Sequence, residues 1–235
     1  MTVKAPTRRC ELALLKVARV VIGVDEVGRG ALAGPVAVGA AAVDRDTKRA
    51  PVGLADSKLL SAGRREALVE PIKAWVSAYS VGWASPEEVS QLGLTAALRL
   101  AGRRALFVLR PRQELGGKVH VLLDGSHDWL SQGDLFSEGF DDSGFPEAPS
   151  WPVTTRVKAD RDCSVVAAAS VLAKVARDRY MMEIPDPGYD WAGNKGYASA
   201  AHVQALRTLG ASQKHRLGWN LPGVDNAPAS SKDKR

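Results

Sequence analysis

The sequence is poor in cysteine and has no long hydrophobic run, and each shortage excludes a class of protein. Only two cysteines, Cys10 and Cys163, occur in 235 residues, and their wide separation excludes a disulfide framework or a cysteine-rich zinc site. No uninterrupted apolar stretch reaches about 18 residues, so no membrane-spanning helix is expected. Lys4, Arg8 and Arg9 precede any apolar run, which excludes a secretory signal. The expected location is therefore a reducing compartment, the cytoplasm.

Positive charge exceeds negative charge in an otherwise ordinary composition. The chain has 32 Lys and Arg against 26 Asp and Glu, a net charge of +6, and 45% hydrophobic residues. This balance favours an anionic partner, with nucleic acid ahead of an acidic membrane surface; no particular partner is the main alternative on charge alone. The length fits one large domain, with or without a helical extension.

Hydrophobic periodicity predicts a mixed α/β fold. The expected strands first follow one another directly and then alternate with helices, which indicates a mixed sheet with helices on both faces. In the predicted helix over residues 94–108, Arg99, Arg103 and Arg104 form a basic side. Strands are expected over 20–25, 35–43, 76–83, 119–124 and 152–158, and further helices over 61–78 with Ser61 as N-cap, from Ser85, from Asp162 or Ser164 to about Met182, and over 199–209.

One stretch of the second half differs in composition from the rest. Residues 119–155 contain no Lys or Arg, and 127–150 are acidic and rich in Gly, Ser and Pro. This composition predicts a solvated surface insertion over 126–151. No strand or helix fixes its acids as metal ligands; they include Asp128, Asp134, Asp141 and Asp142.

Two adjacent acids, Asp25 and Glu26, follow a β-branched run of the kind that is buried in a sheet. An unpaired carboxylate beside a core is unfavourable, so a metal ion or a basic side chain is expected against the pair. Gly28 and Gly30 then flank Arg29; glycine allows close backbone approach, and arginine offers a planar fork of donors suited to phosphate. The combination indicates phosphoryl-transfer chemistry on nucleic acid.

A third acid, Asp124, ends another apolar run and is followed by Gly125. If the two strands are neighbours, the three carboxylates meet at one sheet edge and repel one another unless divalent cations lie between them. Oxygen ligands without His or Cys favour Mg²⁺ or Mn²⁺ over zinc. Two such ions roughly 4 Å apart activate a water and stabilise the leaving oxygen of a phosphodiester. For any one of these acids, a residue capping a turn is the alternative interpretation.

Short motifs occur in order along residues 20–220. An isolated acid–glycine match would be weak, but the ordered series resembles type 2 ribonuclease H, the bacterial ribonuclease HII. The motifs are Gly23-Val24-Asp25-Glu26-Val27-Gly28-Arg29-Gly30, Gly34-Pro35, Asp56-Ser57-Lys58, Leu60-Ser61, Leu123-Asp124-Gly125, Lys158-Ala159-Asp160, Ala167-Ala168-Ala169-Ser170, Ala173-Lys174-Val175, Arg177-Asp178, Lys195-Gly196-Tyr197, His202 and His215-Arg216.

This resemblance implies a ribonuclease H-like mixed β-sheet flanked by helices, with a C-terminal helical extension. The catalytic domain is then expected over 19–223, after an N-terminal segment over 1–18 and before a disordered tail over 224–235. The implied activity is hydrolysis on the 5′ side of ribonucleotides, in RNA–DNA hybrids and at single ribonucleotides in duplex DNA. It leaves 5′-phosphate and 3′-hydroxyl ends, uses two Mg²⁺ or Mn²⁺ ions, and serves ribonucleotide and primer removal. A monomer is expected.

The resemblance also assigns catalytic residues. It implies that Asp25, Glu26 and Asp124 bind metal ions and that Asp160 is the fourth catalytic acid, with Asp178 as a rival. If residues 163–182 form one helix, the two candidates lie roughly 25 Å apart, so both cannot serve one centre. Asp160 precedes that helix at its positive end and is the preferred candidate; Asp178 is expected to pair with Arg177, Arg179 or a neighbouring element.

Substrate contacts follow from the same resemblance. The 2′-hydroxyl distinguishes a ribonucleotide from its deoxy neighbour, and the backbone of Gly28, Arg29 and Gly30 can approach it closely. Tyr197 is similar to the family tyrosine that packs on the sugar beside the cleavage junction; a partly buried core tyrosine is the alternative. Candidate phosphate contacts, each of which could instead be a solvated charge, are Lys58, Lys174, Lys195 and Arg216.

Two other functions remain open at this point. A type 3 ribonuclease H is disfavoured by Arg29 between its glycines and by the lack of an added N-terminal substrate-binding domain. A non-catalytic nucleic-acid-binding module would leave the three converging acids without a purpose. The C-terminal residues contain no aromatic-hydrophobic box of the kind that binds a sliding clamp.

Overall fold

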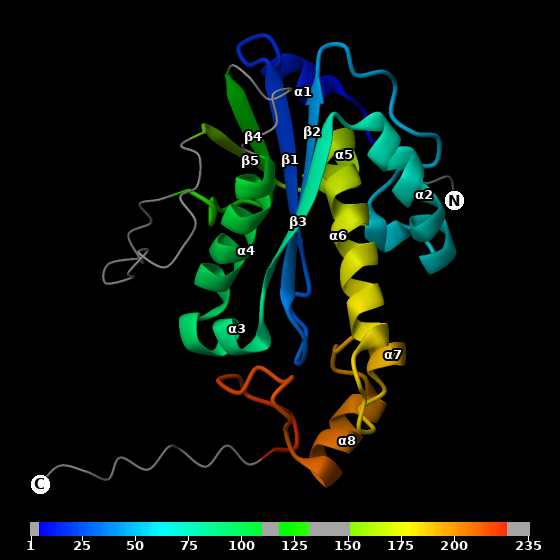
Figure 1. The fold of residues 1–235 in the computed structure, drawn as a ribbon, viewed down its shortest axis with the longest axis vertical. Helices are drawn as coiled ribbons and strands as arrows, with labels where there is room; N and C mark the ends of the chain where they lie inside the picture. Colours follow the sequence, from blue (N-terminus) through cyan, green and yellow to red (C-terminus); the bar gives the residue numbers. More distant parts are fainter. Residues whose placement is uncertain (1–4, 110–117, 132–150, 225–235) are drawn as a thin grey trace, which may run out of the picture.

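A twisted five-stranded sheet forms the centre of the part of the chain that the computed structural model describes, residues 5–109, 118–131 and 151–224 (Figure 1). Its strand order is β3-β2-β1-β4-β5. The pairs β1–β2 and β2–β3 are antiparallel, whereas β1–β4 and β4–β5 are parallel, which confirms the predicted mixed sheet. The strands are β1 (Val20–Val27), β2 (Val36–Asp44), β3 (Ala78–Ala84), β4 (Val119–Asp124) and β5 (Val153–Arg156).

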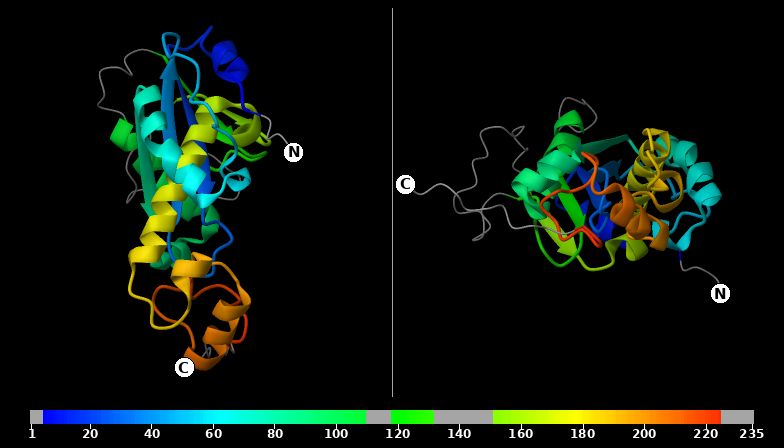
Figure 2. Two further views of the ribbon diagram at one scale, coloured as in Figure 1. Left: turned by 90° about the vertical axis from the view of Figure 1, so that its right-hand side faces the viewer. Right: turned by 90° about the horizontal axis from the view of Figure 1, so that it is seen from below.

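Helices cover both faces of the sheet, as predicted. On one face lie α3 (Pro86–Leu92) and α4 (Leu94–Leu109); on the other lie α2 (Ala62–Trp75), α5 (Ala159–Asp162) and α6 (Ser164–Glu183). The C-terminal helices α7 (Trp191–Asn194) and α8 (Ala200–Leu209) extend beyond one end of the sheet (Figure 2). The remaining elements are α1 (Arg9–Leu14) and the 3₁₀ turn η1 (Ser57–Leu59).

Capping residues explain why several helix starts were predictable from sequence. Ser61 accepts a hydrogen bond from the Arg64 N–H, and Ser85 forms a complete capping box with Glu88. The short elements α1, η1, α5 and α7 have too few residues to show a hydrophobic period, and the sequence did not predict them. Among the helices of the described ranges, none combines the length and hydropathy of a membrane span.

The prediction that the helix over 94–108 has a basic side is wrong. Arg99 and Arg103 are buried, and the Arg99 Nε donates to the Trp129 carbonyl at 3.2 Å. Arg104 forms a forked ion pair with Glu88, with N–O distances of 2.7 and 2.9 Å. Arg99 and Arg103 are buried because α4 packs on the sheet while the chain after β4 covers its flank.

The prediction of a surface insertion over 126–151 is wrong for the first part of this segment. Trp129 and Leu130 are each 3% exposed and join the core between the sheet and α4. Gly102 makes room for both side chains, because a Cβ there would contact them. Asp128 caps this turn by accepting the Leu130 and Ser131 N–H groups. Residues 132–150, with Asp134, Asp141 and Asp142, lie outside the described residues.

The N-terminal segment packs against the start of α6. The Thr7 N–H donates to the Asp162 carbonyl at 3.0 Å, and the Ser164 N–H donates to the Thr7 carbonyl at 3.2 Å. Glu11 is fully buried, and its Oε1 accepts the Val165 N–H at 2.7 Å. A side chain from α1 therefore caps α6, the helix that carries several residues of the site described below.

Glu11 makes stability depend on pH in a definite direction. Burial raises the pKa of its carboxyl above 4.5, although the Val165 N–H opposes the shift. Wild-type stability therefore falls as pH rises from 4.5 through the folded-state pKa. Glu11→Gln removes this titration and keeps an acceptor for the Val165 N–H. We expect the difference in melting temperature between the variant and wild type to increase with pH over this interval. The increase should be roughly 2–4 °C for each kcal/mol of unfolding free energy that wild type loses.

Differential scanning fluorimetry across the pH range measures this difference. Glu183→Gln, at the exposed end of α6, is the matched control and should show no trend. A difference between Glu11→Gln and wild type that stays constant with pH would contradict the role assigned to Glu11.

Candidate active site

The three predicted acids meet at one edge of the sheet. In the parallel pair β1–β4, Val24 lies opposite Leu123, so Asp25 and Asp124 follow at the same level on neighbouring strands. Asp25 is 3% exposed, and Glu26 and Asp124 are half-buried. All three line a cavity of ≈ 350 Å³. The other residues that line it are Val27, Gly28, Arg29, Gly30, Ser57, Lys58, Ser170, Lys174 and Tyr197.

Asp25 carries a buried negative charge that nothing nearby fully compensates. Burial raises the pKa of its carboxyl well above the ordinary value, and repulsion by Glu26 and Asp124 adds to the shift. A hydrogen bond from the Ser170 hydroxyl lowers the pKa only in part. The Ser170 and Ser57 hydroxyl oxygens lie 2.8 Å apart, so the two serines form a polar wall behind Asp25. A bound cation would relieve this electrostatic cost.

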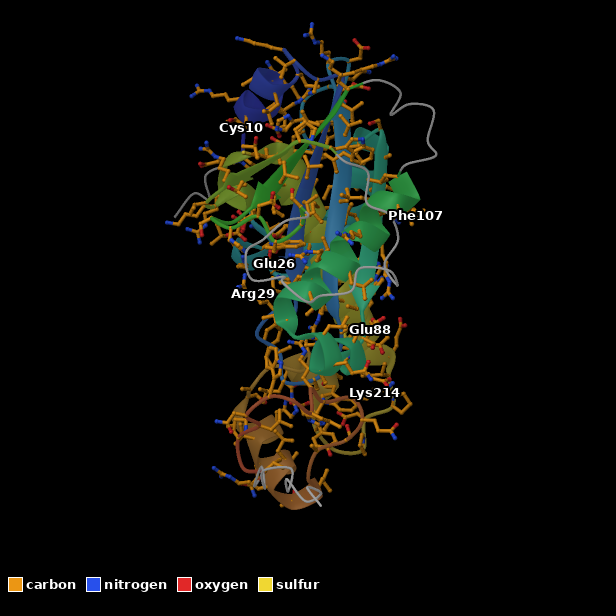
Figure 3. The ribbon with its side chains drawn as sticks, turned by 90° about the vertical axis from the view of Figure 1, so that its left-hand side faces the viewer. Cys10, Glu26, Arg29, Glu88, Phe107 and Lys214 are labelled. Atoms are coloured by element: carbon orange, nitrogen blue, oxygen red, sulfur yellow. The ribbon has the colours of Figure 1, made fainter. Side chains whose placement is uncertain are left out.

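Glu26 and Arg29 lie side by side (Figure 3), and both line the cavity. The Arg29 Nη1 is 3.4 Å from the Glu26 Oε1, and the arginine side chain is 59% exposed. Burial raises the pKa of Glu26, while Arg29 opposes the shift. Because this ion pair is exposed and long, it leaves both groups free to exchange partners when a substrate binds.

Asp160 lies beside Asp124. The Asp124 Oδ1 accepts the N–H groups of Ala159 and Asp160 at 2.6 and 3.5 Å. Asp160 is 3% exposed, and its Oδ2 is 3.2 Å from the Lys58 Nζ. Burial raises the pKa of Asp160, Asp124 and Asp56 raise it further, and Lys58 opposes them. The structure therefore brings Asp160 to the acids at the sheet edge.

Asp178, the rival fourth acid, is committed to other partners. It lies 2.7 Å from the Lys174 Nζ and 3.5 Å from the Arg65 Nη2. Of the predicted partners, Arg177, Arg179 or a neighbouring element, the structure shows the last, through Arg65 of α2; Lys174, on the same helix as Asp178, was not predicted. Its charge serves to hold Lys174 at the cavity wall.

The donor set fits a hard divalent cation, although the acids do not form a closed cage. Within residues 5–109, 118–131 and 151–224, no three Asp, Glu, His or Cys side chains converge closely enough to hold a metal ion as they stand. The acids nevertheless raise one another's pKa values across the cavity, and only oxygen ligands are offered. Like charges repel when no cation separates them, and oxygen ligands suit Mg²⁺ or Mn²⁺.

The glycine loop and Tyr197 line the same cavity as the acids. Gly28 has φ +84°, and a Cβ there would overlap the Arg177 guanidinium, so only glycine fits. Around Gly30 a Cβ would meet nothing within 4 Å. The Tyr197 ring is half-buried, with the Lys174 Nζ 5.5 Å and the Arg177 guanidinium 5.4 Å from its centre.

The four residues predicted to contact phosphate lie in different surroundings. Lys58 and Lys174 line the cavity, whereas the Lys195 ammonium donates to the Ala192 carbonyl on α7. The prediction for Arg216 is wrong: its side chain is fully buried, and it donates to backbone carbonyl groups of the loop after β1. A guanidinium held in this way cannot reach a phosphate.

Ser57, Ser170 and Arg177 were not predicted as site residues. Ser57 and Ser170 line the cavity, and Arg177 lies against the Tyr197 ring. One signal was available, since Ser170, Lys174 and Arg177 are spaced by four and three residues and so share one face of α6. Polar residues on a single face of an alanine-rich helix indicate a site rather than a solvated surface. For Ser57, the only available signal in the sequence was its position next to Lys58.

Sequence comparison gives the family. The family model described as Ribonuclease HII matches residues 22–221. Ribonuclease HII of Streptomyces avermitilis is 45% identical over 223 residues, which cover 93% of this chain and 85% of the relative. Ribonuclease HII of Caulobacter vibrioides is 44% identical over 201 residues, covering 85% and 83%.

Solved structures share the fold. A chain in the complex of PCNA and RNase HII from Archaeoglobus fulgidus superposes with a TM-score of 0.60 and 27% identity, covering 86% of this chain and 96% of that chain. Bst-RNase HIII in complex with Mn²⁺ has a TM-score of 0.60, 21% identity and coverage of 92% and 72%, and shows the fold alone. The predicted ribonuclease H-like α/β fold is confirmed. With the acids at the edge of that sheet and a family match over most of its length, the chain belongs to the ribonuclease HII family of ribonuclease H endonucleases.

Proposed function

We propose that this enzyme hydrolyses the phosphodiester on the 5′ side of ribonucleotides, both in RNA–DNA hybrids and at single ribonucleotides in duplex DNA. The reaction leaves 5′-phosphate and 3′-hydroxyl ends. One observation carries the proposal: Asp25 and its neighbouring acids share a single cavity with the Gly28–Gly30 loop and Tyr197. Groups suited to cutting and groups suited to recognising a sugar therefore line the same cavity. The enzyme would serve ribonucleotide and RNA primer removal, as a cytoplasmic monomer.

Asp25, Glu26 and Asp124 would hold two divalent ions, Mg²⁺ or Mn²⁺, with Asp160 beside them as the fourth acid. When bound, these ions supply a nucleophilic water near neutral pH and neutralise charge on the leaving oxygen. The chain contributes fixed positions for the carboxylates. Lys58 holds Asp160 through an ion pair of 3.2 Å, and its exposed side chain also offers charge to a phosphate at the cavity mouth.

Recognition of the sugar would rest on the backbone of Gly28, Arg29 and Gly30. The 2′-hydroxyl is the group that distinguishes ribose from deoxyribose, and the open space around Gly30 lets backbone groups approach it. Tyr197 would pack on the sugar beside the cleavage junction. Lys174 would contact a phosphate inside the cavity, and Lys195, whose side chain lies on α7, only a phosphate farther along the duplex.

A labelled DNA duplex with a single ribonucleotide tests the proposal. In Mg²⁺ or Mn²⁺ the purified protein should incise on the 5′ side of the ribonucleotide and leave the matched all-DNA duplex intact. Asp124→Asn should lower the rate on the order of 10³-fold, because it removes several kcal/mol of charge stabilisation, while duplex binding persists.

Asp46→Asn is the matched control for this assay. Asp46 is exposed, in the turn after β2, at the end of the sheet away from the acids, and its substitution should leave the rate unchanged. Failure of the wild-type protein to incise with either ion would refute the proposed function. Retained turnover in Asp124→Asn would refute the assignment of that acid.

A further inference from the structure

A fully buried arginine lies directly beneath the glycine loop. The Arg216 Nη2 donates to the Gly28 carbonyl at 2.6 Å and its Nη1 to the Arg29 carbonyl at 2.8 Å. Its Nε and Nη2 each lie 3.3 Å from the Gly34 carbonyl. One guanidinium thus binds three carbonyl groups of a segment that precedes it by more than 180 residues.

A second buried arginine, Arg177 of α6, binds the far end of the same loop. Its Nη2 donates to the Ala33 carbonyl at 3.1 Å and its Nε to the Pro35 carbonyl at 2.8 Å. The Nη1 donates to the Lys195 carbonyl at 2.9 Å, and the guanidinium lies 5.4 Å from the centre of the Tyr197 ring. Arg177 therefore connects the loop to Tyr197, which lines the same cavity.

Main-chain contacts complete the attachment of the loop. The Arg216 N–H donates to the Leu32 carbonyl at 3.0 Å, and the Gly34 N–H donates to the Lys214 carbonyl at 2.8 Å. The Leu32 N–H donates to the Gly196 carbonyl, one residue before Tyr197. Because a peptide unit is planar, fixing the carbonyl groups of the loop from beneath also fixes the directions of its N–H groups.

We propose that Arg216 and Arg177 act as a clamp that sets the position of the Gly28–Gly30 backbone relative to Tyr197, and thereby sets the discrimination between ribose and deoxyribose. This role rests on the proposed function, in which the loop reads the sugar. Arg216 is a positioning residue, since it contacts the loop and not the substrate.

The choice of arginine supports the clamp. Burying a charge is unfavourable unless donors are matched by acceptors, and a guanidinium offers five N–H groups in a rigid fork that matches several carbonyl groups at once. A lysine ammonium has three donors on a flexible stem and cannot reproduce this arrangement. Burial and the neighbouring Arg177 lower the pKa of Arg216 to about 9, which leaves it charged at neutral pH.

Arg216→Lys tests the clamp with two readouts. Without substrate, hydrogen exchange of the amides in residues 28–34 should become faster in the variant. In EDTA, which prevents turnover, the ratio of affinities for the single-ribonucleotide duplex and the all-DNA duplex should fall by about tenfold, the equivalent of one or two hydrogen bonds.

Arg99→Lys is the matched control, because Arg99 is also a buried arginine and binds the Trp129 carbonyl from α4, away from the loop. It should lose stability while loop exchange and the affinity ratio stay at wild-type values. Arg216→Gln, which removes the buried charge and keeps an amide donor, serves as a second variant if Arg216→Lys does not fold.

The two readouts separate this role from the proposed function. Wild-type exchange in residues 28–34 of a folded Arg216 variant would overturn the clamp, whatever the substrate. Faster exchange with an unchanged affinity ratio would overturn its role in discrimination. If the wild-type protein bound both duplexes equally, the proposed substrate would be wrong, and the exchange measurement alone would decide whether Arg216 holds the loop.

Discussion

Asp25→Asn is expected to abolish turnover and, in the absence of metal, to stabilise the fold. The substitution keeps the side-chain volume and the oxygen that accepts the Glu26 N–H at 2.9 Å. It removes the negative charge of a carboxyl group whose pKa is raised by burial and by repulsion from Glu26 and Asp124. We expect a gain of about 1 kcal/mol, roughly 2–4 °C in melting temperature, and a loss of turnover on the order of 10³-fold or more.

Thermal unfolding in EDTA and in Mg²⁺ compares the stability of the variant with that of wild type, first without metal and then with it. In EDTA the variant should melt above wild type. With Mg²⁺ at 100 times its Kd, wild type should gain about 2.7 kcal/mol and overtake the variant, which has lost a ligand. Asp46→Asn, exposed and distant from the acids, should change neither result. A variant less stable than wild type in EDTA would contradict the assignment of Asp25 as an uncompensated charge.

The acid site was predictable because its signals are local. Asp25 and Asp124 each lie at the end of a hydrophobic run that forms a strand, and parallel neighbours bring such ends to one edge. Helix length excluded that Asp160 and Asp178 serve one centre, and the position of Asp160 before the positive end of the helix decided between them. The convergence of the acids required one long-range assumption, that the two strands are neighbours, and the β1–β4 pairing confirms it.

The loop clamp was not predictable, because it depends on which segments meet in three dimensions. Arginine is rarely fully buried, so a sequence places Arg216 and Arg99 on the surface. Their partners are carbonyl groups, which carry no sequence signal at all. Trp129 was missed for a related reason: the acidic composition around it outweighed two apolar residues that fill a space left by Gly102.

Gly39→Ala is expected to disturb the active site indirectly, by displacing α6. Gly39 pairs with Asp25 in the β1–β2 register and faces α6, where a Cβ would overlap the Ala169 carbonyl oxygen. The helix must move away, at a cost of about 1–3 kcal/mol, roughly 2–4 °C of melting temperature for each kcal/mol. Because Ser170 follows Ala169, this movement should also weaken its hydrogen bond to Asp25 and lower turnover beyond the loss of folded protein.

Gly63→Ala is the matched control, because Gly63 lies in the first turn of α2 and a Cβ there meets nothing within 4 Å. It should leave turnover unchanged and gain up to about 1 kcal/mol of helix stability. A double-mutant cycle with Ser170→Ala then identifies the route. If Gly39→Ala acts through Ser170, the two substitutions together should reduce turnover little more than Ser170→Ala alone. Fully additive losses would show that the glycine supports the site by another path, since the helix could shift without disturbing the serine that contacts Asp25.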